Sequence, residues 1–520
     1  MEKPMPQGLN PSRITKLLSS NDAPTGPERA ILKTVALKGA EYLSVLQQRI
    51  SSTRETLYAL LEEQSRQIKS VVDAKELLNP IRRLPEDVLL KIFTACIPTR
   101  IEEMIYASPG EFDSLDVKNA PWVLSQVCAS WRRTTLANPR LWSSISLVMD
   151  KYTNHMGCIF RFGILLARTK THPLMVCIDA NADIALHPLL AMVLPTSSRW
   201  SNLSVTAPLR SFLPFNNISH ALPLLQLLDI RVTGQDSSEG GLESTRIVHG
   251  FQHAPNLCRL NLDLNSQELH PFSRWLVLPM DSEKLSRLNA FTTPFDAASL
   301  LNWHGAKNAK EFCLAMLNYP PQLQQQVEVS TIRHALLQNL SVTESASEST
   351  PGSIAELVSH LRLPALQKLT LIYKDSTIFL PAIDQHTAPL LTDLEILSDP
   401  PTTLDENSVI EMLKWTPRLR HLELAVKFMT PNVFIALGDV EDGAFKLIHF
   451  LETISLMGAQ FQFDDHGRVI TDMVEARFSA EDEDEAGPFF EEIYLDEEVG
   501  DEERWEKLCH GGLNVFVIAS

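Results

Sequence analysis

The sequence predicts an α/β protein in which a long N-terminal helix and a short helical unit precede an irregular solenoid with a parallel sheet. Three observations support this. Residues 35–77 contain no proline and repeat apolar side chains at heptad spacing. Two short apolar segments, each opened by proline, follow within residues 81–147. From residue 200 onward one apolar string returns again and again. With 520 residues the chain is too long for one compact core.

The first element is expected to be one long helix over residues 35–78, ended by Asn79 and Pro80. Its apolar side chains follow a heptad seam in which Thr53 and Gln64 are weak positions. Two interpretations remain: the helix packs on its own protein, or residues 37–77 form a coiled-coil homodimer. Residues 1–30, rich in proline, serine and asparagine, are expected to be disordered. The seam consists of Leu43, Leu46, Ile50, Leu57 and Leu60.

The second element is a two-part helical unit, "LNPIRRLPEDVLLKIFTAC" (78–96) and "PWVLSQVCASWRRTTLANPRLW" (121–142). Pro85 is placed early in the first helix, where a missing N–H costs little, and two acidic residues follow in the first turn. Pro121 is expected to open a second helix with an apolar stripe, ended by Pro139. Such a short unit cannot bury all its apolar surface internally. The second stripe contains Leu124, Val127, Cys128 and Trp131.

The third element is a repeat of the form L-x-x-L-x-L. Its eleven copies start between residues 200 and 490, so the mean interval is 29 residues. A string of this form at this period is typical of leucine-rich repeats, in which x-L-x-L is a short strand and the next segment returns as a helix or turn. Whole units, each a helix, a proline-containing turn and then the strand, are expected in "NSVIEMLKWTPRLRHLEL" (407–424) and "VHGFQHAPNLCRLNL" (248–262). The copies start at 200, 225, 257, 285, 309, 337, 366, 391, 419, 451 and 490.

The helical unit also carries a family resemblance. Its pattern, L-P-x-[DE]-[VI]-L-x-x-I-F, then V-x-x-x-W, then P-x-L-W, resembles an F-box over residues 81–147. The domain order is similar to that of F-box proteins with C-terminal leucine-rich repeats. The resemblance implies a substrate receptor of a Skp–cullin–F-box (SCF) ubiquitin ligase, with the box on the Skp-type adaptor and, through it, on cullin. The implied adaptor contacts are Leu84, Pro85, Leu89, Ile92, Phe93, Val127, Cys128, Trp131 and Trp142.

One segment departs from the family pattern. Residues 98–120 lengthen the connection between the two halves of the box, which puts the docking of the second half in doubt. Two alternatives remain beside the ligase receptor. The unit over residues 81–142 could be a helical cap of the repeats, or the same modules could serve a scaffold protein outside any ligase.

The repeated string predicts a leucine-rich-repeat-like solenoid over residues 148–475, followed over 476–520 by an acidic C-terminal segment with the last repeat. The resemblance implies that the repeats hold a protein substrate. Strand positions between the leucines are the candidates for substrate contact, because they would face outward. They are Arg259, Asn261, Asp263, Lys368, Thr370, Glu395, His421 and Glu423.

Composition narrows the function classes. The formal net charge of −18 argues against nucleic acid as a partner. The chain has no run of about eighteen apolar residues and no apolar core of a secretory signal, so a membrane span is not expected. Seven scattered cysteines favour a reducing interior. An intracellular location, cytoplasmic and/or nuclear, is therefore expected.

No motif of an enzyme stands out. The sequence has no phosphate-binding loop, no H-E-x-x-H and no G-x-S-x-G, so we expect a protein without catalytic activity or cofactor. A metal site at His249, His253 and Cys258 is disfavoured because these residues lie where a repeat turns into its strand. A hydrolase within 150–200 would have only His155, His172 and His187 to draw on, with no nucleophile partner.

Overall fold

The computed structural model describes residues 10–98, 112–152, 156–218, 222–233, 247–264, 272–317, 331–345, 353–374, 377–383, 387–441, 444–479, 490–496 and 502–517. The chain divides into two compact units, Met1–Leu89 and Leu90–Ser520. Together they make a mixed α/β protein with a long N-terminal helix and a large, open parallel sheet.

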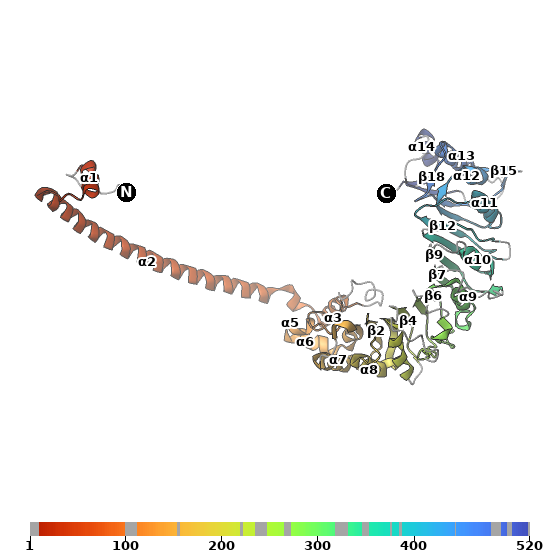
Figure 1. Ribbon diagram of the computed structural model, residues 1–520, viewed down its shortest axis with the longest axis horizontal. Helices are drawn as coiled ribbons and strands as arrows, with labels where there is room; N and C mark the ends of the chain where they lie inside the picture. The colour runs from red at the N-terminus through yellow and green to blue at the C-terminus, as the bar shows by residue number, and fades with distance from the viewer. Residues whose placement is uncertain are drawn as a thin grey trace. The chain divides into compact units, whose positions relative to one another are not determined.

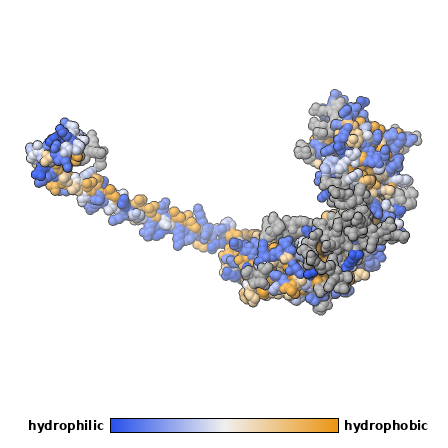
Figure 2. All heavy atoms as spheres, viewed as in Figure 1, coloured by the Kyte–Doolittle hydropathy of each residue, from blue (hydrophilic) through white to orange (hydrophobic). Residues whose placement is uncertain are grey.

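The first unit is helical. It contains α1 (Pro11–Ser20), α2 (Gly26–Leu78) and the 3₁₀ helix η1 (Pro80–Arg83). The long helix ends before Asn79 and Pro80, as predicted, and has 53 residues. None of its residues is buried, and Figure 2 shows apolar and polar side chains interspersed along its surface.

The expectation of disorder over residues 1–30 is not met from Asn10 onward, and residues 1–9 lie outside the described part. These residues are ordered because two helices are capped here. Proline, serine and asparagine, which suggested disorder, are also the residues that begin and cap helices. The Asn10 side chain accepts a hydrogen bond from the Ser12 N–H (3.1 Å) and so begins α1. Glu28, the third residue of α2, completes a capping box with the N-cap Thr25. Its carboxylate accepts from the Thr25 N–H (2.8 Å) and pairs with Arg13 (3.0 Å). These partners lower the pKa of Glu28 to about 2.

The second unit begins with helical segments and continues as alternating strands and helices. α3 (Glu86–Ala95) crosses the division between the units and is followed by α5 (Leu124–Val127), α6 (Ala129–Ala137) and η2 (Pro139–Trp142). The later helices are η3 (Met149–Tyr152), α7 (Met156–Thr169), α8 (Pro188–Val193), η4 (Leu194–Arg199), η5 (Leu209–Asn217), η7 (Phe272–Arg274), α9 (Pro294–Asn302), η8 (His304–Ala306), α10 (Ser353–Ser359), α11 (Glu406–Lys414), α12 (Asn432–Gly438), α13 (His466–Phe478) and α14 (Glu502–His510).

Fourteen described strands form one sheet in chain order, and every pairing is parallel. They are β1 (Ser144–Val148), β2 (Leu174–Asp179), β3 (Trp200–Ala207), β4 (Leu227–Val232), β5 (Arg259–Asp263), β6 (Arg287–Thr292), β7 (Glu311–Leu317), β9 (Asn339–Ser345), β11 (Lys368–Lys374), β12 (Asp393–Asp399), β13 (His421–Ala425), β17 (Thr453–Ser455), β19 (Glu492–Leu495) and β20 (Asn514–Val517). Three two-stranded pairs accompany them: β8 (Ile332–Arg333) with β10 (Leu361–Arg362), β14 (Lys427–Phe428) with β18 (Gln460–Phe461), and β15 (Val440–Glu441) with β16 (Ala444–Phe445).

The apolar string sets the register of this sheet. Each of the eleven predicted strings overlaps one of the strands from β3 to β19 of the large sheet. Equivalent leucines lie side by side: Leu228 is opposite Leu260, which is opposite Leu288. These side chains are completely buried, while the residues between them point to the other face. Figure 1 shows α9, α10 and α11 on one side of the strands, so the leucine face is the one the helices cover.

Two sequence predictions about the repeats are corrected. The sheet begins earlier and ends later than expected, because β1, β2 and β20 are strands without the string. Residues 248–253 form turns and a single bridge in place of the predicted helix. Here the Asn216 side chain accepts from the N–H groups of His249 (2.8 Å) and Gly250 (3.2 Å), which fixes a turn. Gly250 also lies so close to the chain that an added Cβ would be 2.2 Å from the Phe215 carbonyl oxygen.

Candidate partner-binding surfaces

The helical segments of the second unit are held on the sheet by tryptophans. The Trp142 indole N–H donates to the Thr135 carbonyl (2.9 Å), and its ring meets that of Trp122 edge-on at 5.0 Å. The Arg168 guanidinium on α7 lies over both rings, 4.7 Å from the centre of Trp122 and 4.3 Å from that of Trp142. Such contacts fix the position of the segment relative to the first strands.

Three of the nine predicted adaptor contacts are buried within the chain. Phe93 has no exposed surface and packs against Trp131 at 4.8 Å between ring centres. Trp142 is 1% exposed and Leu89 is 5% exposed. These side chains serve the chain's own core, and we remove them from the set of candidate contacts. The sequence predicted an outward position for them because so short a helical unit was expected to leave part of its apolar surface open.

The other six residues reach the surface. Pro85, Ile92, Val127 and Cys128 are exposed, and Leu84 and Trp131 are half-buried. Val127 is 58% exposed and Ile92 is 39% exposed. Ile92 and Val127 match the F-box pattern and can lose water contact in an interface, so they are the candidate contacts of the second unit.

The second predicted helix is in fact two. Cys128 adopts an extended conformation (φ −157°, ψ 171°), which ends α5, and its Sγ accepts from the Trp131 N–H (3.5 Å) at the start of α6. The predicted stripe is therefore interrupted. Val127 belongs to the end of one helix and Trp131 to the first turn of the next.

The end of the inserted segment covers the free edge of the sheet. Of residues 98–120, positions 99–111 lie outside the described part, but 112–120 are described. The Ser114 N–H donates to the Ser146 carbonyl (3.0 Å), and the Ser146 N–H donates to the Ser114 hydroxyl (2.8 Å). The indole N–H of Trp122 then donates to the Ser114 carbonyl (2.8 Å). This segment blocks β1 as a docking edge, which agrees with the alternative of a helical cap.

On the uncovered face of the sheet, the predicted substrate positions form polar rows. Thr370, Glu395 and Glu423 are neighbours on successive strands. The Thr370 hydroxyl donates to Glu395 (2.7 Å), whose carboxylate also pairs with Lys368 (2.5 Å). Burial, together with the nearby Glu395 charge, raises the pKa of Glu423.

These rows border a shallow hollow of about 290 Å³ that includes Glu395, His421 and Glu423. The Thr370 side chain is buried and hydrogen-bonded to Glu395, whereas His421 is exposed. Arg259, Asn261 and Asp263 lie on β5, six strands away from β13 in the sheet order, so they do not join this hollow. Arg259 is exposed, and Asn261 accepts from the Asn289 amide (2.8 Å).

The histidines of the sequence analysis are not assembled into a site. The His249 ring contacts the Ile247 carbonyl (3.2 Å), His253 lies 3.7 Å from Asp281, and Cys258 donates to the Asn256 carbonyl (3.3 Å). Among the described residues, no group of three or more metal-ligating side chains is placed to hold an ion. His187 caps α8 through its ring nitrogen, and His155 lies outside the described part. Most of the acidic stretch 481–503 also lies outside it.

None of the described helices is both long enough and apolar enough to cross a bilayer. No model of a known protein family matches the chain, and no curated protein matches it.

Proposed function

We propose that the chain is the substrate-recognition subunit of an SCF-type ubiquitin ligase. The helical segment would bind a Skp-type adaptor, and the sheet, as an irregular leucine-rich-repeat solenoid, would hold a protein substrate on its uncovered polar face. The chain would contribute position, because it raises the effective concentration of the substrate near the transferring enzyme.

The main support for this proposal is the exposure of two side chains that match the F-box pattern, Ile92 and Val127. Both occupy positions that the F-box pattern assigns to the adaptor, and they are 39% and 58% exposed. Val117, Val123 and Leu136 are exposed as well, so the pattern and the exposure together single out Ile92 and Val127. Burying an aliphatic side chain at an interface contributes roughly 1.5–3 kcal/mol before the costs of association. Introducing a charge there would leave it without a partner in the interface.

The test is co-purification of the full chain with the adaptor and cullin. Ile92→Glu and Val127→Glu are expected to lower adaptor recovery by about tenfold or more. The matched control is Ile435→Glu, since Ile435 is 55% exposed on α12, far along the sequence from the helical segment. That variant is expected to recover the adaptor as the wild type does.

The outcomes separate the alternatives. Adaptor and cullin recovered together support the ligase receptor. Adaptor without cullin favours the scaffold protein. Wild-type recovery from the Ile92→Glu and Val127→Glu double variant would contradict the F-box assignment and leave the helical cap as the better interpretation.

A further inference from the structure

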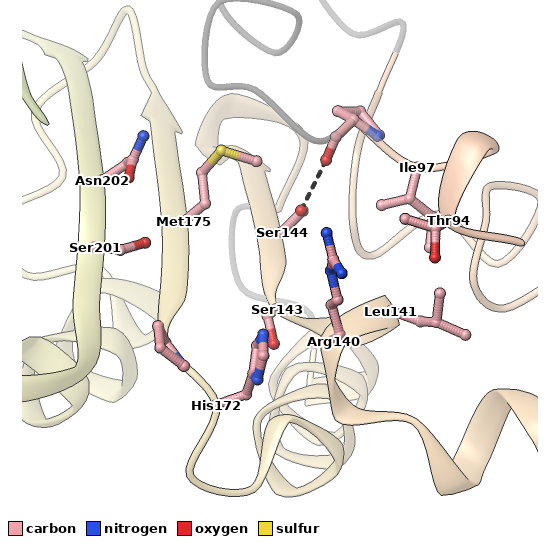
Figure 3. A pocket seen from close by; sticks show the side chains of 12 residues that line it. Thr94, Ile97, Arg140, Leu141, Ser143, Ser144, His172, Met175, Ser201 and Asn202 are labelled. Carbon is pink, nitrogen blue, oxygen red and sulfur yellow. Dashed lines mark hydrogen bonds between the residues drawn. The ribbon is translucent and has the colours of Figure 1, made fainter. Parts of the chain in front are cut away.

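A second hollow, of about 180 Å³, lies where the strands β1, β2 and β3 begin. Figure 3 shows side chains from three directions around it: Arg140 from η2, His172 from the turn before β2, and Asn202 from β3. The twelve described residues that line it include no aspartate or glutamate. In a chain with a formal net charge of −18, an acid-free lining that contains an arginine is a notable local exception.

The hydroxyl groups that line this hollow already donate hydrogen bonds to backbone carbonyls. Ser144 donates to the Pro98 carbonyl (2.8 Å), the bond drawn in Figure 3, and Ser201 donates to the Leu174 carbonyl (3.0 Å). The Thr94 hydroxyl donates to the Leu90 carbonyl (2.8 Å). These bonds hold the walls in place. They also turn the hydroxyl hydrogens away, so the hydroxyls are not the groups that would recognise a ligand.

Three side chains with nitrogen donors remain available to a ligand. In the part of the chain that the structure describes, the side chains of Arg140, His172 and Asn202 make no hydrogen bond or ion pair. Arginine offers five N–H groups in a planar fork suited to oxyanions, and the Asn202 amide offers two more. Burial and the positive charges of Arg140 and Arg199 lower the pKa of His172, so the ring is neutral at pH 7 and one ring nitrogen can donate.

The volume limits the ligand. Sites for drug-sized molecules occupy roughly 300–1,000 Å³, so this hollow suits a single small group. We propose that it binds a small oxyanion, a phosphate or phosphoryl group, held by Arg140, His172 and Asn202. The two sources of this chemistry are the free ion and a phosphorylated side chain of a protein. The inference is independent of the proposed function, since none of these residues belongs to the candidate adaptor surface.

The experiment is calorimetric titration of the full chain with inorganic phosphate in a chloride buffer at constant ionic strength. The wild type is expected to bind one phosphate saturably. Arg140→Gln is expected to weaken binding by about tenfold or more, because a charge-assisted hydrogen bond is lost, and Asn202→Ala less so. Arg133→Gln is the matched control: it removes the same charge at an exposed position of α6 that does not line the hollow, and should bind as the wild type does.

A second arm uses a short phosphoserine peptide and its unphosphorylated twin. Tighter binding of the phosphopeptide than of phosphate assigns the site to a phosphorylated partner, and equal binding assigns it to the free ion. The proposal is overturned if neither phosphate nor the phosphopeptide gives a saturable signal, or if Arg140→Gln binds as tightly as Arg133→Gln. Adaptor recovery by the same variants is expected to be unchanged, so failure here is distinct from failure of the ligase assignment.

Discussion

Residues that a motif marks as contacts can instead hold the fold together, and Trp142 is the clearest case. It matches the last position of the F-box pattern, yet it is 1% exposed, bonded to the Thr135 carbonyl and covered by Arg168. Burial lowers the pKa of that arginine, so the two indole faces replace part of its lost hydration. The sequence pattern cannot separate these roles, because an apolar ring suits a core and an interface equally well.

Trp142→Ala is therefore expected to lower the free energy of unfolding by about 3–5 kcal/mol, the usual range for a buried tryptophan. Val127→Glu, on an exposed residue, is expected to change it by about 0.5 kcal/mol or less. Urea unfolding followed by tryptophan fluorescence and circular dichroism measures both. Equal effects of the two variants would contradict the assignment of Trp142 to the core.

His334 is expected to make stability depend on pH. It is 3% exposed, its Nε2 contacts the Ala306 carbonyl at 2.7 Å, and its Nδ1 is buried without a hydrogen-bond partner. Protonation would place an N–H at Nδ1 with no acceptor, and burial lowers the pKa of His334 accordingly. The folded state thus binds this proton less readily than the unfolded state, whose pKa is about 6.5.

The difference between the folded and unfolded pKa of His334 sets the direction in which stability changes with pH. The contribution of His334 to stability is complete above about pH 6.5 and is lost as the pH falls from there toward the lowered folded pKa. His334→Gln keeps a donor for the Ala306 carbonyl but cannot titrate. The loss of thermal stability between pH 7 and pH 5 should be smaller for this variant than for the wild type. Identical pH profiles of the melting temperature would refute the prediction.

At the scale of elements, α2 presents a long apolar seam without cover. None of its 53 residues is buried, and Leu43 (62% exposed), Leu57 (53%) and Leu60 (63%) lie on the heptad seam. Helices in proteins gain most of their stability from packing such a face, so a lone α2 lacks its main support. Of the two interpretations of the sequence, we favour the coiled-coil homodimer, because a second copy offers the same seam in return.

Light scattering coupled to size exclusion is then expected to give twice the chain mass of 58.3 kDa. Leu57→Glu places a charge in the seam and should return the monomer. Ala59→Glu places the same charge two positions away, on the opposite side of the helix, and should leave the dimer intact. A monomeric wild type at micromolar concentration would contradict the prediction, as would a dimer that survives Leu57→Glu.

At the scale of the whole molecule, the repeat could be predicted because each string supplies its own register. The last two apolar side chains of each string stand at alternate positions, most often with a leucine among them, and every one of the eleven strings overlaps a strand. The string did not predict the strands β1, β2 and β20. Their sequences, "SISLV", "LMVCID" and "NVFV", are apolar but lack the leucine spacing. The hollow at Arg140 could not be predicted at all, since its donors come from three separate elements.

The sequential order of the sheet has a mechanical consequence. Each strand pairs only with the strands before and after it in the sheet, so a local defect has few direct routes to distant strands. Leu340 of β9 is 1% exposed and lies opposite Phe312 of β7 and Leu369 of β11. Leu340→Ala leaves a cavity that costs about 2–5 kcal/mol.

We expect this variant to accelerate amide hydrogen exchange in β7, β9 and β11 by several orders of magnitude, with little change in β2 or β19, because the lost contacts belong to adjacent strands. Ser341→Ala, one position away on the uncovered face, is the control and should leave exchange nearly unchanged. Mass-spectrometric exchange resolves these peptides. A uniform acceleration across all strands would instead mean that the sheet opens as one cooperative unit, and that the helices between strands carry coupling along its whole length.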